Sequence, residues 1–96
     1  MKTRKQVIKD TVKAYIKNNK EDYKAFLGLI KHRRKGLGNK MLATFADKKG
    51  RAELSLPEKL WQVLDMSMDD PRFLITNEEV RWFGKTFPQF LIPYEF

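Results

Sequence analysis

The sequence predicts an all-α fold, or a mainly α fold with one short hairpin, as a compact single domain of about five short helices with an extended apolar C-terminal tail. Apolar residues recur at helical spacing through most of the chain, between breaks formed by glycine, proline and asparagine. Three of these stretches follow a capping-box signature, in which Ser or Thr stands three residues before Glu or Gln. At 96 residues and 42% hydrophobic content, the chain has the size of one domain, residues 1–96.

The first helix is predicted over residues 4–18, after the capping box Thr3-Arg4-Lys5-Gln6. Its apolar stripe consists of Val7, Ile8, Val12, Tyr15 and Ile16. A row of lysines at intervals of four residues lies off this stripe: Lys5, Lys9, Lys13 and Lys17. Each like-charge pair costs a few tenths of a kcal/mol in an isolated helix. The row is either a site for a polyanion or a solvated helix face, and the sequence favours neither.

A second helix is predicted to start at Lys20-Glu21-Asp22, with its acids in the first turn, and to end in a basic run at residues 31–35. Its apolar stripe consists of Tyr23, Phe26, Leu27 and Ile30. Gly36 supplies the left-handed position that ends a helix, and Asn39 is the predicted N-cap of the next one. This arrangement exposes amide groups at a helix start, where phosphates and carboxylates bind.

The basic run has two interpretations. Cations in a last turn offset the helix dipole at roughly 0.3–1 kcal/mol each, but one or two suffice, and here four crowd together at repulsive cost. We therefore favour an anion-binding surface over a merely capped helix end. Its predicted members are Lys31, Arg33, Arg34, Lys35, Gly38, Asn39 and Lys40, together with the four lysines of the first helix.

The segment Gly36-Leu37-Gly38-Asn39-Lys40-Met41-Leu42-Ala43 resembles the turn of a helix-hairpin-helix DNA-binding motif, in which two glycines flank a hydrophobe before a phosphate-binding helix. It departs from that motif because the small residue of the second helix comes one position late, at Ala43, and because Arg34 replaces a hydrophobe. The resemblance covers fewer than ten residues. It implies phosphate binding at a helix start and assigns no family.

Residues 39–50 fit a helix or part of a hairpin. The helix has an apolar stripe of Leu42, Phe45 and Ala46, and Met, Leu and Ala favour it. The hairpin has its turn at residues 47–50, followed by polar and apolar alternation over residues 51–56. We favour the helix. The hairpin would resemble the wing of a winged-helix protein and would add Lys48, Lys49 and Arg51 to the anion-binding surface.

Two more helices are predicted in the second half of the chain. One follows the capping box Ser55-Leu56-Pro57-Glu58 and ends before Asp69-Asp70-Pro71; its apolar residues are Leu60, Trp61, Val63, Leu64 and Met68. The acid pair is expected to close the helix and not to bind metal. Residues 73–75 are predicted to form a buried linker or strand. The last helix follows the box Thr76-Asn77-Glu78-Glu79, carries Val80, Phe83 and Phe87, and ends at Pro88.

The C-terminal segment, residues 89–96, contains Pro93 and is too apolar to lie in water. We expect it to fold back over the chain's own core. The alternative is that it docks on a partner or on a second copy of the chain, with Trp82, Phe90, Tyr94 and Phe96 as the anchors.

The net charge of +8 is unevenly placed. Residues 1–40, the basic helical half, carry thirteen lysines and arginines against three acids, which gives +10. Residues 41–96, the aromatic-rich half, carry seven against nine, which gives −2. Such asymmetry is typical of a protein with a polyanionic partner.

Several classes are not expected. There is no cysteine, and the lone histidine, His32, stands among cations, so we expect no metal centre and no cofactor. No catalytic or nucleotide-binding motif is present, so we expect no enzyme. The start has no apolar signal region, and the longest apolar run, residues 25–30, is far shorter than the roughly 20 residues of a membrane span. We expect a soluble, intracellular, cytoplasmic protein.

The leading hypothesis is a small basic protein that binds DNA or RNA through phosphates, without strong sequence preference. The alternative is a protein-binding inhibitor or adaptor that uses its basic face on an acidic protein surface, or its aromatic C-terminal segment in an apolar groove. A third hypothesis is that the first helix lies on an anionic membrane, although its apolar face lacks tryptophan.

Overall fold

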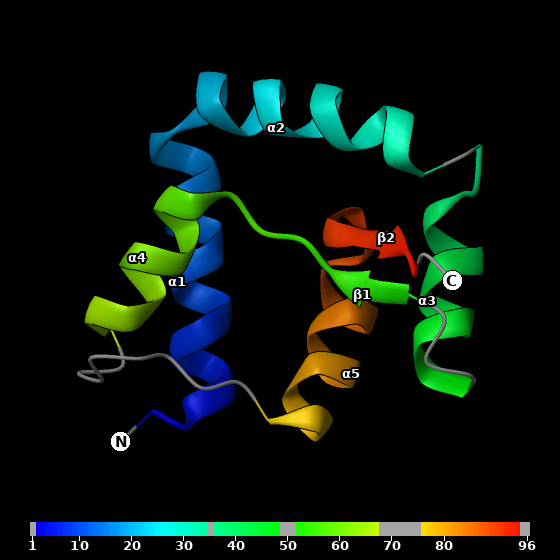
Figure 1. Cartoon of the computed structure of the whole chain (residues 1–96). Helices are drawn as coiled ribbons and strands as arrows, with labels where there is room; N and C mark the ends of the chain where they lie inside the picture. The colour runs from blue at the N-terminus through cyan, green and yellow to red at the C-terminus, as the bar shows by residue number, and fades with distance from the viewer. Residues whose placement is uncertain (1, 35, 49–51, 68–75, 95–96) are drawn as a thin grey trace. The chain divides into compact units, whose positions relative to one another are not determined.

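A computed structural model of the chain describes residues 2–34, 36–48, 52–67 and 76–94. These residues form five α-helices, one 3-10 helix and a two-stranded antiparallel sheet (Figure 1). In chain order the elements are α1 (Arg4–Asn18), α2 (Lys20–Arg33), α3 (Asn39–Lys48), β1 (Ala52–Leu54), α4 (Glu58–Ser67), α5 (Asn77–Thr86), η1 (Pro88–Phe90) and β2 (Leu91–Pro93). The predicted mainly α fold with about five helices is confirmed.

The elements belong to two units, each made from two separate stretches of the chain. Unit 1 comprises residues 1–25 and 56–74, and unit 2 comprises residues 26–55 and 75–96. Neither unit coincides with the basic or the acidic half of the sequence. Both carry ten lysines and arginines, against seven acids in unit 1 and five in unit 2, so their net charges are +3 and +5.

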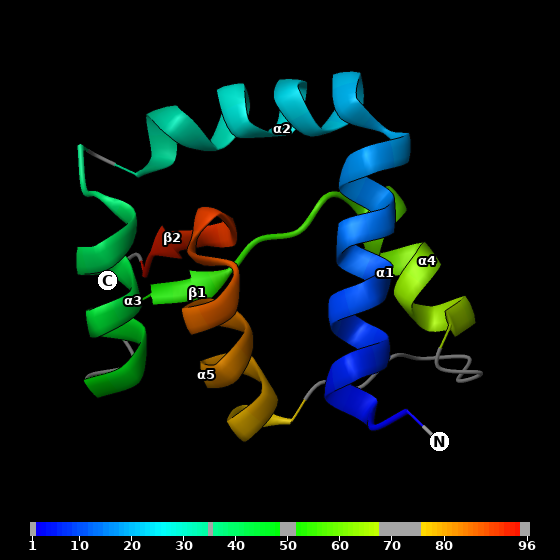
Figure 2. The same cartoon turned by 180° about the vertical axis from the view of Figure 1, so that it is seen from behind.

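In unit 1, α1 packs against α4 (Figures 1 and 2). The predicted stripe of α1 supplies the buried side chains Ile8, Val12 and Tyr15, and α4 supplies Leu60 and Leu64. The helix α1 has the predicted bounds, and its capping box is formed by Thr3 and Gln6. Val63, which the sequence grouped with the apolar residues of α4, is 37% exposed.

The start of α4 differs from the predicted one. The helix begins at Glu58, and the Pro57 carbonyl accepts the hydrogen bonds of the Leu60 and Trp61 amides. Pro57 therefore occupies the capping position that we predicted for Ser55. The Ser55 amide instead donates to the Phe90 carbonyl at 2.7 Å, so Ser55 is held next to the sheet and outside the helix.

Unit 2 is built around α3, which packs against α5, η1 and both strands. Aromatic rings fill its centre: Phe83 lies 5.2 Å from Phe87 and 5.9 Å from Phe90, and Phe26 lies 6.0 Å from Phe90, measured between ring centroids. Buried aliphatic side chains complete this core: Leu42 from α3, and Leu91 and Ile92 from β2. The predicted cap of α5 is confirmed, since Thr76 and Glu79 form a reciprocal capping box.

The helical interpretation of residues 39–48 is confirmed, and the hairpin interpretation of this stretch is wrong. The strand β1 exists within the predicted alternating segment, but it pairs with β2 in the register Ala52 to Pro93. The wing that the hairpin would have made is therefore absent from residues 39–48. Lys48 ends α3, whereas Lys49 and Arg51 lie outside the described residues.

Residues 90–92 of the C-terminal segment lie in the core of their own unit, as predicted. Phe90 and Leu91 are fully buried and Ile92 is 3% exposed, whereas Tyr94 is 50% exposed. The predicted helix end at Asp69-Asp70-Pro71 and the predicted linker at residues 73–75 lie outside the described residues.

Candidate functional site

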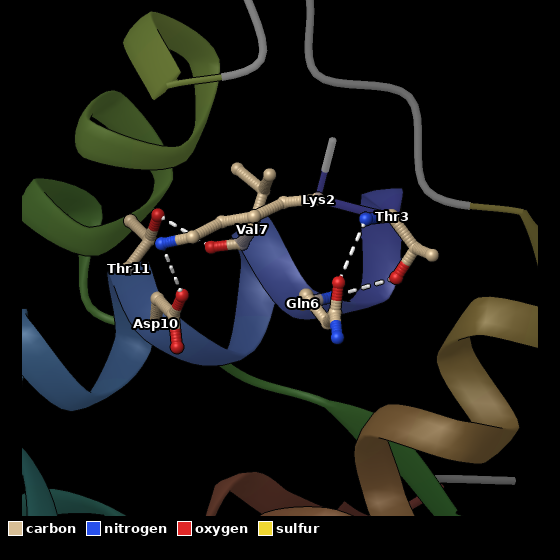
Figure 3. Close-up of polar contacts among 6 residues, drawn as sticks. All are labelled: Lys2, Thr3, Gln6, Val7, Asp10 and Thr11. Atoms are coloured by element: carbon tan, nitrogen blue, oxygen red, sulfur yellow. Dashed lines mark hydrogen bonds and ion pairs between the residues drawn. The ribbon is translucent and has the colours of Figure 1, made fainter.

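Hydrogen bonds at the start of α1 hold the first turn of the lysine-bearing helix (Figure 3). The Thr3 hydroxyl accepts from the Gln6 amide at 3.2 Å, and the Gln6 side chain accepts from the Thr3 amide at 2.9 Å. One turn further on, the Thr11 hydroxyl donates to the Val7 carbonyl at 2.7 Å. The first turn of α1 is therefore capped by the Thr3 and Gln6 side chains and not by its lysines.

The predicted lysine row of α1 is exposed along its whole length: Lys5, Lys9, Lys13 and Lys17. At about 100° per residue, a spacing of four advances each lysine by about 40° around the helix axis. The four ammonium groups therefore spread over about a third of the helix circumference. They form a broad cationic surface, not a narrow stripe.

Asp10 lies within this surface and has a basic partner of its own. The Lys2 ammonium donates to the Asp10 carboxylate at 2.8 Å (Figure 3). This hydrogen bond holds the pKa of Asp10 below its usual value, and the charges of Lys13 and Lys9 lower it further. Asp10 is thus ionised at neutral pH and forms an ion pair with Lys2.

Asp22, one of the two acids in the first turn of α2, is also paired within unit 1. The Lys59 ammonium of α4 donates to the Asp22 carboxylate at 2.6 Å, which raises the pKa of Lys59. Beside this pair, the Tyr15 hydroxyl is buried without a hydrogen-bond partner among the described residues. Burial raises the pKa of Tyr15, and the negative charge of Asp22 raises it further, so the phenol stays neutral.

The hinge between α2 and α3 is the second predicted basic region, and it lies in unit 2. The helix α2 carries Lys31, His32 and Arg33 in its last turn, all exposed. Gly36 has a φ of +78°, the left-handed conformation predicted for it. The Leu37 amide then donates to the Arg34 carbonyl at 2.9 Å and closes the turn. Lys35 lies outside the described residues.

The start of α3 is displaced by one residue from the prediction. The Leu42 amide donates to the Gly38 carbonyl at 3.1 Å, and Asn39 is the first helical residue. Gly38 therefore takes the capping position that we predicted for Asn39; glycine is nearly as acceptable there as asparagine. The geometry leaves the amides of the first helical turn without intrahelical acceptors. Gly38, Asn39 and Lys40 are all exposed.

A hollow of about 440 Å³ adjoins this hinge. Its apolar wall consists of Leu27, Ile30 and Leu37. Its polar wall consists of Lys31 and Arg34 from the basic run, Asn39 from α3 and Gln89 from η1, with Gly36 between the two helices. Of the predicted site residues, Lys31, Arg34 and Asn39 are therefore brought together around one concave surface.

Arg34 is the most constrained cation of the hollow. It is half-buried, and its terminal nitrogen donates to the Pro88 carbonyl at 3.3 Å. Its Nε group is buried without a hydrogen-bond partner among the described residues. Burial lowers the pKa of Arg34, but a guanidinium stays charged throughout the physiological range. The hollow therefore contains a permanent, oriented positive charge.

Lys40 faces a neighbouring hollow of about 280 Å³ with Ala43, Thr44, Asp47 and Lys85. Lys85 pairs with Asp47 at 3.1 Å between Nζ and Oδ1, so this second hollow is closer to neutral than the first. Arg33 is exposed and lines neither hollow among the described residues.

The sequence did not reveal the apolar wall or Gln89 as members of a site. Leu27 and Ile30 were assigned to a core stripe, and Gln89 belongs to a segment that is far from the hinge along the chain. In the sequence, only the expectation that the C-terminal segment folds back over the core indicated that Gln89 could lie near other parts of the chain.

The aromatic residues of the alternative interface differ in exposure. Phe90 is fully buried and packs on Phe26, Phe83 and Phe87, so it is a core residue and not an accessible anchor. Trp82 is half-buried and Tyr94 is 50% exposed. Phe96 lies outside the described residues.

In the described part of the chain, no helix is long and apolar enough to cross a membrane. Within the same residues, no three acidic or histidine side chains come together in a way that could hold a metal ion.

Fold and site together define a class: a mainly α protein with an exposed lysine surface on one helix and a basic hollow at a helix hinge. No protein-family model matches the sequence, and no curated protein or solved structure is significantly similar to it.

Proposed function

We propose that this chain is a nucleic-acid-binding protein, and not an enzyme, that contacts phosphates of DNA or RNA without strong sequence preference. The observation that carries the proposal is the hinge, where the exposed cations of α2 lie beside the start of α3, whose first amides lack intrahelical acceptors. Amides at a helix start bind phosphate oxygens, and lysine and arginine supply the charge that releases counterions from the nucleic acid.

The lysine surface of α1 supports the same proposal independently. Its one internal acid, Asp10, is paired with Lys2, so the surface keeps most of its positive charge. The two basic regions belong to different units, so the proposal assigns phosphate contacts to each of them separately. Binding by either region therefore predicts strong dependence on salt.

The salt dependence can be given a magnitude. Each neutralised phosphate contributes about −0.9 to the slope of log K against log salt for double-stranded DNA, and about −0.7 for a single strand. Four contacts to a single strand give a slope of about −2.8, which weakens binding about 50-fold between roughly 50 and 200 mM salt.

The test is binding of the whole chain to labelled DNA and RNA oligonucleotides, single- and double-stranded, across a salt series. The hinge variant is Arg33→Gln, and its matched control is Arg81→Gln, an exposed arginine on α5. We expect Arg33→Gln to weaken binding at every sequence and to reduce the slope by up to about one, with a smaller effect of Arg81→Gln.

A double variant, Lys9→Gln with Lys13→Gln, tests the α1 surface separately. The proposal fails if the unmodified chain does not bind any of the oligonucleotides at roughly 50 mM salt. It also fails at the hinge if Arg33→Gln and Arg81→Gln reduce affinity equally, because the effect is then one of net charge alone.

An acidic protein surface is the alternative partner of the basic regions, and the exposure of Tyr94 favours a protein interface next to β2. Tyrosine is enriched among the residues that dominate interface energy. A chain that fails to bind nucleic acid but cross-links to an acidic protein, and loses that product on Tyr94→Ala, would support this alternative.

A further inference from the structure

We infer that the hollow at the hinge between α2 and α3 accepts one unstacked base of a single-stranded nucleic acid, whose phosphates lie on the surrounding cations. This inference rests on the proposed function and specifies it: the preferred partner is a single strand and not a duplex. It follows from the combination of an apolar wall, two side-chain amides (Asn39 and Gln89) and positive charge around one concave surface.

The apolar wall suits the face of a base. Ile30 is 3% exposed, and Leu27 and Leu37 are half-buried, so the wall is backed by the unit's core and not by water. A volume of about 440 Å³ lies in the range of about 300–1,000 Å³ typical of sites for small organic groups. A planar base placed there would bury one of its apolar faces against this wall and away from water.

The polar wall suits the edge of a base and its phosphate. Asn39 and Gln89 each carry an amide that donates and accepts, as the edges of all four bases require. Lys31 and Arg34 supply the positive charge for the neighbouring phosphates. Because the Pro88 carbonyl already orients Arg34, its guanidinium loses less freedom on binding than an exposed arginine does.

This arrangement favours a single strand over a duplex. Bases in a duplex are stacked and paired, and moving one out costs a few kcal/mol, whereas a single strand presents its bases without that cost. A protein that contacted phosphates alone would bind the duplex at least as well, because the duplex has the higher charge density. The order of affinities therefore separates the inference from the proposed function.

The experiment uses the unmodified chain and three probes of equal length: a single strand of ordinary thymidine nucleotides, the same backbone with its bases removed, and the corresponding duplex. We expect the ordinary single strand to bind about fivefold more tightly than the abasic one, because burying about 40 Å² of apolar base surface on the aliphatic wall at about 25 cal/mol per Å² contributes about 1 kcal/mol. Both single strands should keep a similar salt slope, because their phosphates are the same.

Variants then locate the effect at the hollow. Leu37→Ser should reduce the ratio between ordinary and abasic affinities toward one without changing the salt slope. The matched control is Leu29→Ser, on the exposed side of α2, where the leucine is 71% exposed. The thermal melting curve of each variant shows whether it is folded, and the comparison of probes on the unmodified chain does not depend on either variant.

Equal binding of the ordinary and abasic strands, with a normal salt slope, would overturn this inference and leave the proposed phosphate binding intact. An equal loss of the ratio in Leu29→Ser and Leu37→Ser would also overturn it, since the base would then not occupy the hollow. Failure of all three probes to bind at roughly 50 mM salt would overturn the proposed function and this inference together.

Discussion

Replacing Phe90 by alanine tests whether the C-terminal segment belongs to the core or serves as an interface. The ring is fully buried and lies 5.9–6.4 Å from three other phenylalanine rings, between centroids. The Phe90 carbonyl also accepts the Ser55 amide at 2.7 Å, and this bond is kept in the variant because it involves the backbone. The substitution therefore removes side-chain packing and little else.

Deleting a buried phenylalanine ring costs about 3–5 kcal/mol, because apolar contact is lost and a cavity remains. A chain of this length has a total stability of about 5–14 kcal/mol. Phe90→Ala should therefore remove between about a fifth and all of the free energy of unfolding. With a urea slope of about 2 kcal/mol per molar, a loss of about 4 kcal/mol lowers the unfolding midpoint by about 2 M.

The assay is urea unfolding followed by tryptophan fluorescence and by far-ultraviolet circular dichroism. Trp82 lies in α5 of unit 2 and reports on the region of the substitution, whereas Trp61 lies in α4 of unit 1. The matched control is Tyr94→Ala, which removes a ring that is 50% exposed and should cost less than about 1 kcal/mol.

A midpoint shift in Phe90→Ala no larger than that in Tyr94→Ala would refute the reasoning. The segment would then contribute little to the core, and its aromatic residues would be candidates for a partner-binding surface. A large shift in Phe90→Ala alone supports the core assignment and leaves Tyr94 as the exposed aromatic of the segment.

Two further predictions concern the helices. Gly28→Ala should raise the free energy of unfolding in urea by about 0.5–1 kcal/mol, because an added Cβ there would meet nothing within 4 Å. Gly84→Ala should give no such gain, because its Cβ would lie 3.1 Å from the buried Leu91 side chain. Equal gains in the two variants would contradict this reasoning. The Lys2 hydrogen bond lowers the folded pKa of Asp10, so its stabilising effect is present above the unfolded pKa of about 4 and is lost as pH falls through the folded value. Lys2→Ala should raise the pKa of Asp10 in a carboxyl NMR titration, and the free energy of unfolding should then fall less as the pH is lowered. An unchanged pKa would exclude this hydrogen bond in solution.

Local signals in the sequence were sufficient for most helix boundaries. The capping boxes at Thr3 and Thr76 were predicted to the residue, because each involves side chains only three positions apart. The box at Ser55 failed because the Ser55 amide bonds to Phe90, a contact between distant residues that no local pattern reveals. The partner of β1 was missed for the same reason.

The cations of the candidate site were predictable, and its shape was not. Basic residues near a glycine hinge are visible in the sequence, and Gly36 has the predicted left-handed conformation. The hollow also needs Gln89, which reaches the hinge only through tertiary packing. Leu27 has the apolar spacing of a core residue, and only the structure distinguishes a residue that lines a hollow from one that is enclosed.

The pairing of β1 with β2 sets the order in which this protein can fold during synthesis. A ribosome synthesises the chain from its N-terminus at about 5–20 residues per second. About 2–8 s therefore pass between the synthesis of β1 and the completion of β2, and the aromatic core of unit 2 cannot form before Phe90 is made. During that interval the apolar sides of α3 and α5 have no permanent cover, so the nascent chain is most vulnerable to aggregation just before residues 90–93 are complete.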